Sequence, residues 1–141
     1  MNHDLINAKQ QLATGQFTCV LCKGDHTITA TARGVRPLVE LLQEGTLPGY
    51  SAADKVVGKA TAFLYVLLGV TAVYTPVISA PALAVLQRFG IAASCDMVVE
   101  AIFNRDRTGF CPMETAVRNI DDPAAAHARV LEVLSRGIHK V

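Results

Sequence analysis

The stretch from Ala60 to Val85 contains no charged residue, and this feature constrains the fold more than any other. An uncharged run of this length is long enough for a transmembrane helix. However, Gly69, Pro76 and Pro81 interrupt it, and the residues after Gly69 become β-branched, as in "VTAVYT". Because glycine and proline mark turns and helix ends, the pattern favours a buried helix followed by a buried strand over a membrane span.

The composition is that of one globular domain, which we expect to cover residues 1–141. The chain is 51% hydrophobic and has a formal net charge of +1, which argues against a nucleic-acid or anionic membrane partner. The apolar excess favours a homo-oligomer that hides part of the surface. The first residues, "MNHDLINAKQQLATG", are too polar for a signal peptide, so we expect a cytoplasmic location.

The remaining sequence alternates between helix and strand patterns. Residues 17–23 and 26–32 flank a Gly-Asp pair and predict a β-hairpin. The strand after Gly69 should lose its pairing near Pro76, and residues 96–104 favour helical spacing. We predict helices at 4–14, 35–44, 51–68, 79–89, 111–120 and 121–137, and further strands at 71–75 and 91–95.

Strands that alternate with buried helices indicate an α/β fold, a three-layer α/β/α sandwich. The two strands that follow Gly69 and Gly90 should be parallel, because a helix connects them. Together with the antiparallel hairpin they predict a mixed sheet. In such sheets ligands bind at the carboxyl ends of parallel strands, where helices begin.

The predicted helix from Ser51 to Leu68 offers one such site. Ser51 and Asp54 have the S-x-x-D spacing of a capping box. Lys55 and Lys59 would then lie one turn apart beside free backbone N–H groups, which suits an anion. In an alternative interpretation one of these lysines is a perturbed base. In another, both lysines form a solvated rim and Asp54 only caps the helix.

Two further helix starts carry candidate site residues. Ser79 is a possible N-cap, and Glu114 lies three residues after Cys111. Cys111 precedes a proline at a predicted helix start, and Arg105 and Arg107 lie shortly before it. These features favour a thiolate nucleophile, although a buried capping cysteine is the alternative.

The other cysteines and the histidines indicate no metal or cofactor site. Cys19 and Cys22 have C-x-x-C spacing, but on a strand their side chains would point to opposite faces. We interpret them as small buried hydrophobic residues in a reducing compartment. None of the four histidines shows metal-ligand spacing, and no cofactor motif is present.

Two blocks of the sequence support a family resemblance. "AADKVVGKATAFLYVLLGVTAVYTPVIS" and "NRDRTGFCPMETAV" resemble a family of short prokaryotic proteins of unknown function. The resemblance covers about residues 17–117 and implies a cytidine-deaminase-like fold. It also implies that Asp54, Lys55 and Cys111 occupy positions proposed to replace the zinc site of that fold.

Zinc deaminases carry H-x-E or C-x-E at one core helix start and P-C-x-x-C at the next. The predicted first start here reads Ala-Ala-Asp-Lys, and the second reads Pro81 followed by alanine and leucine. The resemblance therefore implies a fold without the zinc ligands, and a zinc-independent function.

Three function classes follow. The first is an enzyme that uses Cys111 as nucleophile, with Lys55 or Asp54 transferring a proton or orienting the substrate. The second is a module that binds a nucleotide-like or other anionic small molecule, with Ser51, Lys59, Ser79 and Glu114 as ligand-binding residues. The third is a structural homo-oligomer.

The first class predicts that Cys111 is the most reactive thiol. Its iodoacetamide labelling rate, followed by mass spectrometry, should reach a plateau at lower pH than that of an ordinary thiol. Lys55→Ala should move this plateau to higher pH if Lys55 stabilises the thiolate. Equal labelling of all four cysteines only after denaturation would reduce Cys111 to a capping residue.

Overall fold

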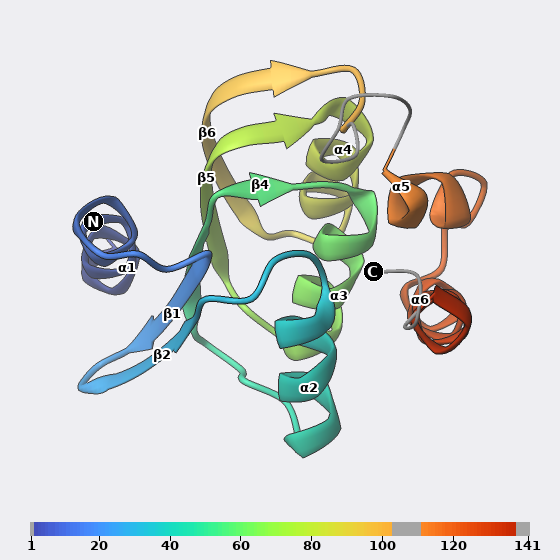
Figure 1. The fold of residues 1–141 in the computed structure, drawn as a ribbon. Helices are drawn as coiled ribbons and strands as arrows, with labels where there is room; N and C mark the ends of the chain where they lie inside the picture. Colours follow the sequence, from blue (N-terminus) through green and yellow to red (C-terminus); the bar gives the residue numbers. More distant parts are fainter. Residues whose placement is uncertain (1, 103–110, 138–141) are drawn as a thin grey trace.

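A six-stranded mixed sheet forms the centre of the molecule, and helices flank both of its faces (Figure 1). The computed structural model describes residues 2–102 and 111–137. Its elements are, in chain order, α1 (His3–Thr14), β1 (Cys19–Lys23), β2 (His26–Ala30), α2 (Arg36–Glu44), β3 (Ser51–Asp54), β4 (Val56–Val57), α3 (Lys59–Leu68), β5 (Ala72–Ser79), α4 (Ala80–Arg88), β6 (Ala92–Val99), α5 (Pro112–Val117) and α6 (Pro123–Gly137).

The sheet combines an antiparallel half with a parallel half. β1 pairs antiparallel with both β2 and β3, so the predicted hairpin is confirmed. Its turn contains Gly24 at φ +58°, a left-handed conformation that glycine adopts readily. β3, β4 and β6 all pair in parallel with β5, as predicted for the strands that follow Gly69 and Gly90.

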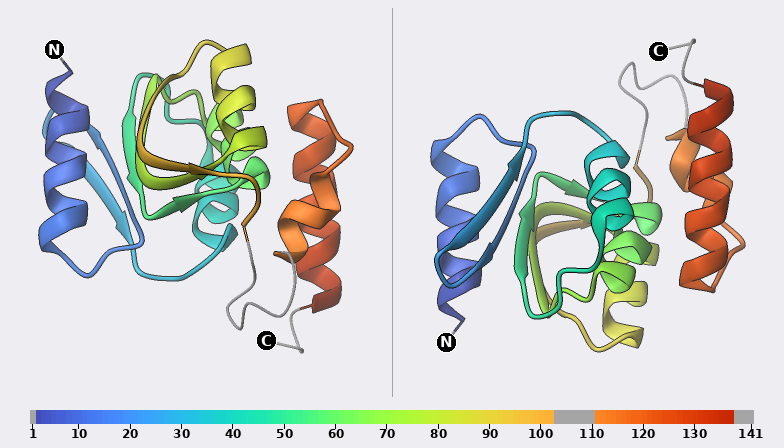
Figure 2. Two further views of the ribbon diagram at one scale, coloured as in Figure 1. Left: turned by 90° about the horizontal axis from the view of Figure 1, so that it is seen from above. Right: turned by 90° about the horizontal axis from the view of Figure 1, so that it is seen from below.

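The helices lie in distinct layers on the two sides of the sheet (Figure 2). Among the described helices, α1 is the one that covers the first face, over a small apolar cluster that includes Ala8, Val20 and Tyr74. α2, α3 and α4 cover the other face over the main core, where Phe63 and Leu64 are fully buried. α5 and α6 form an additional outer layer against α3. The arrangement is therefore that of an α/β sandwich with an extra helical layer.

The predicted helix over residues 51–68 is wrong in its first half. Residues 51–54 form β3, which β1 and β5 flank on its two sides. Its alanines, Ala52 and Ala53, are fully buried because the main core covers one face and α1 covers the other. The S-x-x-D pattern is thus part of a central strand, and α3 begins only at Lys59, with Gly58 as its N-cap.

This correction separates the two lysines. Lys55 is exposed in the bend between β3 and β4, whereas Lys59 is buried in the first turn of α3. They do not share a helix face, and Lys55 does not approach from a helix opposite Cys111.

Two other boundaries also differ from the prediction. Pro76 lies inside β5, where the pairing with β6 continues at Thr75 and Val77 on either side of it. Residues 96–99, expected as helix, complete β6. Pairing with the long central β5 decides both cases, because it supplies hydrogen bonds that local spacing does not reveal.

The first part of the uncharged run lies in α3, which is buried in the protein core and not in a membrane. This helix has ten residues, seven of them buried. Within residues 2–102 and 111–137, no helix combines the length and the apolar character needed to cross a bilayer.

A charge inside this helix should prevent folding. Leu64 is fully buried, and an unpaired buried carboxylate costs several kcal/mol, out of a typical stability of about 5–15 kcal/mol. We expect Leu64→Asp to be absent from the soluble fraction on expression. Leu131→Asp is the matched control, because Leu131 is 38% exposed and should tolerate the charge. Normal solubility and unfolding of Leu64→Asp would contradict the buried position.

Candidate active site

A small cleft opens where α3, α4 and α5 begin and β6 ends. Its volume is about 90 Å³. The cleft lies at the carboxyl end of the parallel strands, the usual place for ligands in such sheets. It is lined by Lys59, Pro81, Glu100, Ala101, Glu114 and Arg118.

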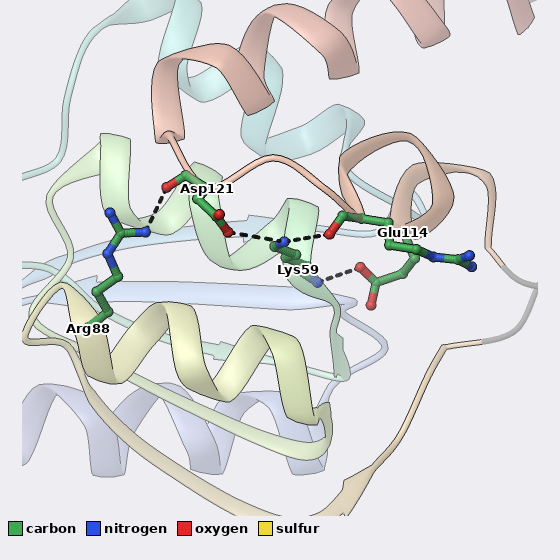
Figure 3. A network of polar contacts seen from close by, with 5 residues as sticks. Lys59, Arg88, Glu114 and Asp121 are labelled. Carbon is green, nitrogen blue, oxygen red and sulfur yellow. Dashed lines mark hydrogen bonds and ion pairs between the residues drawn. The ribbon is translucent and has the colours of Figure 1, made fainter.

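Glu114 places its carboxylate on the N-terminus of α3 (Figure 3). The backbone N–H of Lys59 donates to Glu114 Oε2 at 2.7 Å. A Cβ at Gly58 would lie 2.7 Å from Glu114 Oε1, so glycine is needed for this close approach. The carboxylate satisfies one of the free N–H groups of the first helical turn and complements the helix dipole.

Lys59 carries a largely buried charge between the core and the outer helical layer. The residue is only 8% exposed. Its Nζ donates to the carbonyl oxygen of Arg118 at 2.9 Å and lies 3.7 Å from Asp121 Oδ1. The Asp121 side chain is 84% exposed, so this ion pair is long and largely hydrated.

A second hollow lies on the other side of Lys59. It has a volume of about 180 Å³ and shares Lys59 and Pro81 with the first cleft. Arg88 lies on its wall and donates through Nη1 to the carbonyl oxygen of Asp121 at 2.7 Å (Figure 3). Lys59 therefore stands between two hollows, with an arginine beside each.

The structure brings only some of the predicted site residues to this place. Lys59 and Glu114 are in direct contact. Ser79 is buried as the N-cap of α4, where its Oγ accepts from Ala82 N at 3.3 Å, and it does not line the cleft. Ser51 begins β3, away from the cleft, and its Oγ accepts from Asn2 Nδ2 at 2.9 Å.

Of the proposed trio of Asp54, Lys55 and Cys111, only the two neighbours Asp54 and Lys55 lie together in the described structure. Cys111 is half-buried at the start of α5, and its N–H donates to the carbonyl oxygen of Ile102 at 2.9 Å. The Asp54 carboxylate accepts from the backbone N–H of its neighbour Lys55, but among the residues that the structure describes no hydrogen bond or ion pair links Cys111 to either of them. Arg105 and Arg107 lie outside the described residues.

Asp54 is half-buried in a separate polar cluster beneath α3, beside the buried Tyr65 and Cys19. The Tyr65 hydroxyl donates to Asp54 Oδ2 at 2.6 Å, and Cys19 lies opposite Asp54 in the β1–β3 register. Burial raises the pKa of Asp54 to about 6, although the hydrogen bonds from Tyr65 and from the backbone N–H of Val56 oppose this shift. Burial, together with the Asp54 charge, raises the pKa of Cys19 to about 12, so this thiol is unreactive.

Several of these residues were not singled out from the sequence. Glu100 and Arg118 line the cleft, but neither belongs to a recognisable motif. Arg118 follows Glu114 by four residues, the spacing of one helical turn, which is a weak signal. In the sequence, Tyr65 is expected only as one of the residues of the apolar helix.

Within the described residues, no group of three or more His, Cys, Asp and Glu side chains could hold a metal ion. The corrected start of α3 reads Gly58-Lys59-Ala60, which still lacks the His or Cys of a zinc deaminase.

Comparisons with known proteins agree on one family. The model of a family described as "Domain of unknown function (DUF1893)" matches residues 7–134. A crystal structure at 2.70 Å resolution of a DUF1893 family protein (TM1506) from Thermotoga maritima is similar, with a TM-score of 0.84 and 26% sequence identity. The similarity covers 94% of this chain and 91% of that chain. No curated protein matches the chain.

Asp54 should make stability depend on pH. Its pKa is about 6 in the fold and near the ordinary 3.8 in the unfolded chain, so the native state binds the extra proton between these values. The free energy of unfolding should therefore fall as pH rises from about 4 to 7, by at most about 3 kcal/mol.

Asp54→Asn should remove this dependence, because the amide oxygen can still accept from Tyr65 but cannot ionise. In urea unfolding from pH 4 to 7, the free energy of unfolding of Asp54→Asn should rise relative to that of the wild type as the pH rises. Asp25→Asn, at an exposed turn position, is the control and should leave the wild-type slope unchanged. Parallel pH profiles for the wild type and Asp54→Asn would contradict the raised pKa of Asp54.

Proposed function

This chain belongs to the DUF1893 family, a domain of unknown function, and we propose that it binds the anionic head group of a nucleotide-like small molecule beside Lys59. We further propose that its sheet and helices form a cytidine-deaminase-like fold whose cleft works without zinc. The position of the cleft at the carboxyl ends of parallel strands, where ligands bind in such sheets, supports the proposal that it is a binding site.

The observation that carries the proposal is the Glu114 carboxylate on the N-terminus of α3. It is an oxyanion held by a helix N–H group, beside a buried ammonium group. Phosphates and carboxylates bind at helix N-termini through the same N–H groups and the same dipole. The Glu114 carboxylate thus indicates the kind of group that the N-terminus of α3 binds, namely an oxyanion.

Lys59 can exchange one of its partners for a ligand. The Arg118 carbonyl holds its Nζ at 2.9 Å, whereas the exposed Asp121 carboxylate lies 3.7 Å away. Because this distance is long and the Asp121 carboxylate is solvated, its pairing with the buried Lys59 is weak, and an incoming anion can replace it. The guanidinium groups of Arg88 and Arg118 add positive charge on the two sides.

The size of the cleft limits what enters it. A volume of about 90 Å³ is well below the roughly 300 Å³ or more of a typical small-molecule pocket. Only a phosphate, a carboxylate or a similar group fits, so the rest of the molecule would lie across the neighbouring hollow or in solvent.

An enzyme is the second candidate, because Cys111 and Glu114 share α5. Cys111 begins this helix and is half-buried, whereas Cys19 and Cys22 are buried. In this version the Cys111 thiol adds to an unsaturated carbon of the bound substrate. The C–S bond forms as the π bond of that carbon breaks toward its neighbouring heteroatom, the thiol proton passes to Glu114, and Lys59 holds the anionic group. Asp54 and Lys55 take no direct part, because Tyr65 engages Asp54 and Lys55 lies in an exposed bend.

Ligand binding should appear as a rise in melting temperature. Inorganic phosphate and adenosine monophosphate should stabilise the wild type above sodium chloride of equal ionic strength, and neutral cytidine should not. Lys59→Gln should weaken binding at least tenfold in calorimetry. Lys55→Gln is the matched control and should bind like the wild type, because Lys55 lies outside the cleft.

Glu114→Gln tests the same site in the opposite direction. The amide oxygen can still accept from the Lys59 N–H, but the negative charge that repels an anion is gone. Phosphate should therefore bind this variant more tightly than the wild type. If neither phosphate nor adenosine monophosphate raises the melting temperature at 10 mM, the proposal is wrong. If Lys55→Gln loses binding and Lys59→Gln does not, the binding site lies at the bend around Lys55 instead.

A further inference from the structure

Among the described strands, β6 is an open edge of the sheet, and Asp96 is its single charged residue. It pairs with β5, and among the described residues no strand pairs with its other side. Its eight residues, AASCDMVV, include no proline, lysine or arginine. Met97 is 59% exposed and Val98 is 48% exposed. Natural edge strands usually carry charges, bulges or prolines that prevent pairing with another chain.

We propose that β6 pairs antiparallel with β6 of a second copy across a two-fold axis, so that the two sheets become continuous. The outward N–H and C=O groups of an edge strand are a template for pairing with the strand of another chain. The other open edge of this sheet, β2, would pair with β6 only in a head-to-tail manner that does not close. Pairing of β6 with itself closes after two copies.

The faces of β6 restrict the register of this pair. Ala93 and Cys95 pack toward the main core, whereas Asp96 accepts from Tyr74 Oη at 2.7 Å on the α1 face. A two-fold axis normal to the sheet keeps each face on its own side, and residues directly opposite each other share a face. The axis must therefore pass through a residue position rather than between two.

Of the two central positions, Cys95 gives the better pairs. An axis at Asp96 would place two carboxylates opposite each other, which is unfavourable. An axis at Cys95 places Ser94 opposite Asp96 of the second copy. It also sets Met97 against an alanine at position 93 and Val98 against an alanine at position 92. Each exposed large side chain then faces a small one, so the strand is complementary to itself.

The oligomeric state gives the first test. Sedimentation equilibrium from 5 to 100 μM should show a dimer of the wild type. Ser94→Asp should raise the dissociation constant at least tenfold, since it places like charges opposite Asp96 twice in each dimer. Ser94→Asn is the matched neutral control and should dimerise like the wild type. Ser94 is exposed, so neither change should disturb folding.

Crosslinking tests the register. Directly opposite residues in antiparallel strands have Cα atoms about 4.5–5.5 Å apart, within the range that a disulfide spans. The oxidant diamide should therefore join two copies through Cys95, giving a dimer band without reductant. Cys95→Ser should abolish the band, and Cys111→Ser should retain it.

A monomeric wild type at 100 μM would overturn the proposal. So would a dimer that Ser94→Asp leaves unchanged, because its interface would then lie elsewhere. A dimer that is weakened by Ser94→Asp but not crosslinked through Cys95 would refute the register centred on Cys95.

Discussion

The pairing of β3 on both of its sides is the constraint on which the rest of the structure depends. β1 and β5 flank residues 51–54, and this joins the antiparallel and parallel halves of the sheet. The bend at Lys55 then ends the pairing with β1, and β4 continues along β5. The chain leaves β4 through Gly58 directly into α3. Lys59 reaches the carboxyl end of the parallel strands for this reason.

Once Lys59 is buried, its charge organises the surrounding layers. A buried ammonium group is stable only with hydrogen-bonding partners. Here they come from the segment after α5, which supplies the Arg118 carbonyl and the Asp121 carboxylate. Glu114 adds a contact to the backbone of the same residue. Lys59, Glu114 and Arg118, which make the polar contacts between α3 and the outer helices, therefore also line the cleft.

The two polar centres of the molecule have different physical characters. Around Lys59, opposite charges meet at the edge of solvent, where an ion can exchange. Around Asp54, a carboxylic acid, a phenol and a thiol are enclosed between the sheet and α3, and burial raises the pKa of Asp54 and of Cys19. The first centre is the one where we propose that a ligand binds, and the second is the one that we expect to make stability depend on pH.

Local signals in the sequence determined the hairpin around Gly24, the cap of α4 at Ser79 and the general alternation of helix and strand, because turn and capping residues act within a few positions. They also marked Lys59 and Glu114 as candidates. Only the tertiary structure decided that residues 51–54 form a strand, since pairing with β1 and β5 overrides a local helix signal. It also decided that Lys59 meets Glu114, 55 positions away, because packing brings the start of α5 onto the start of α3.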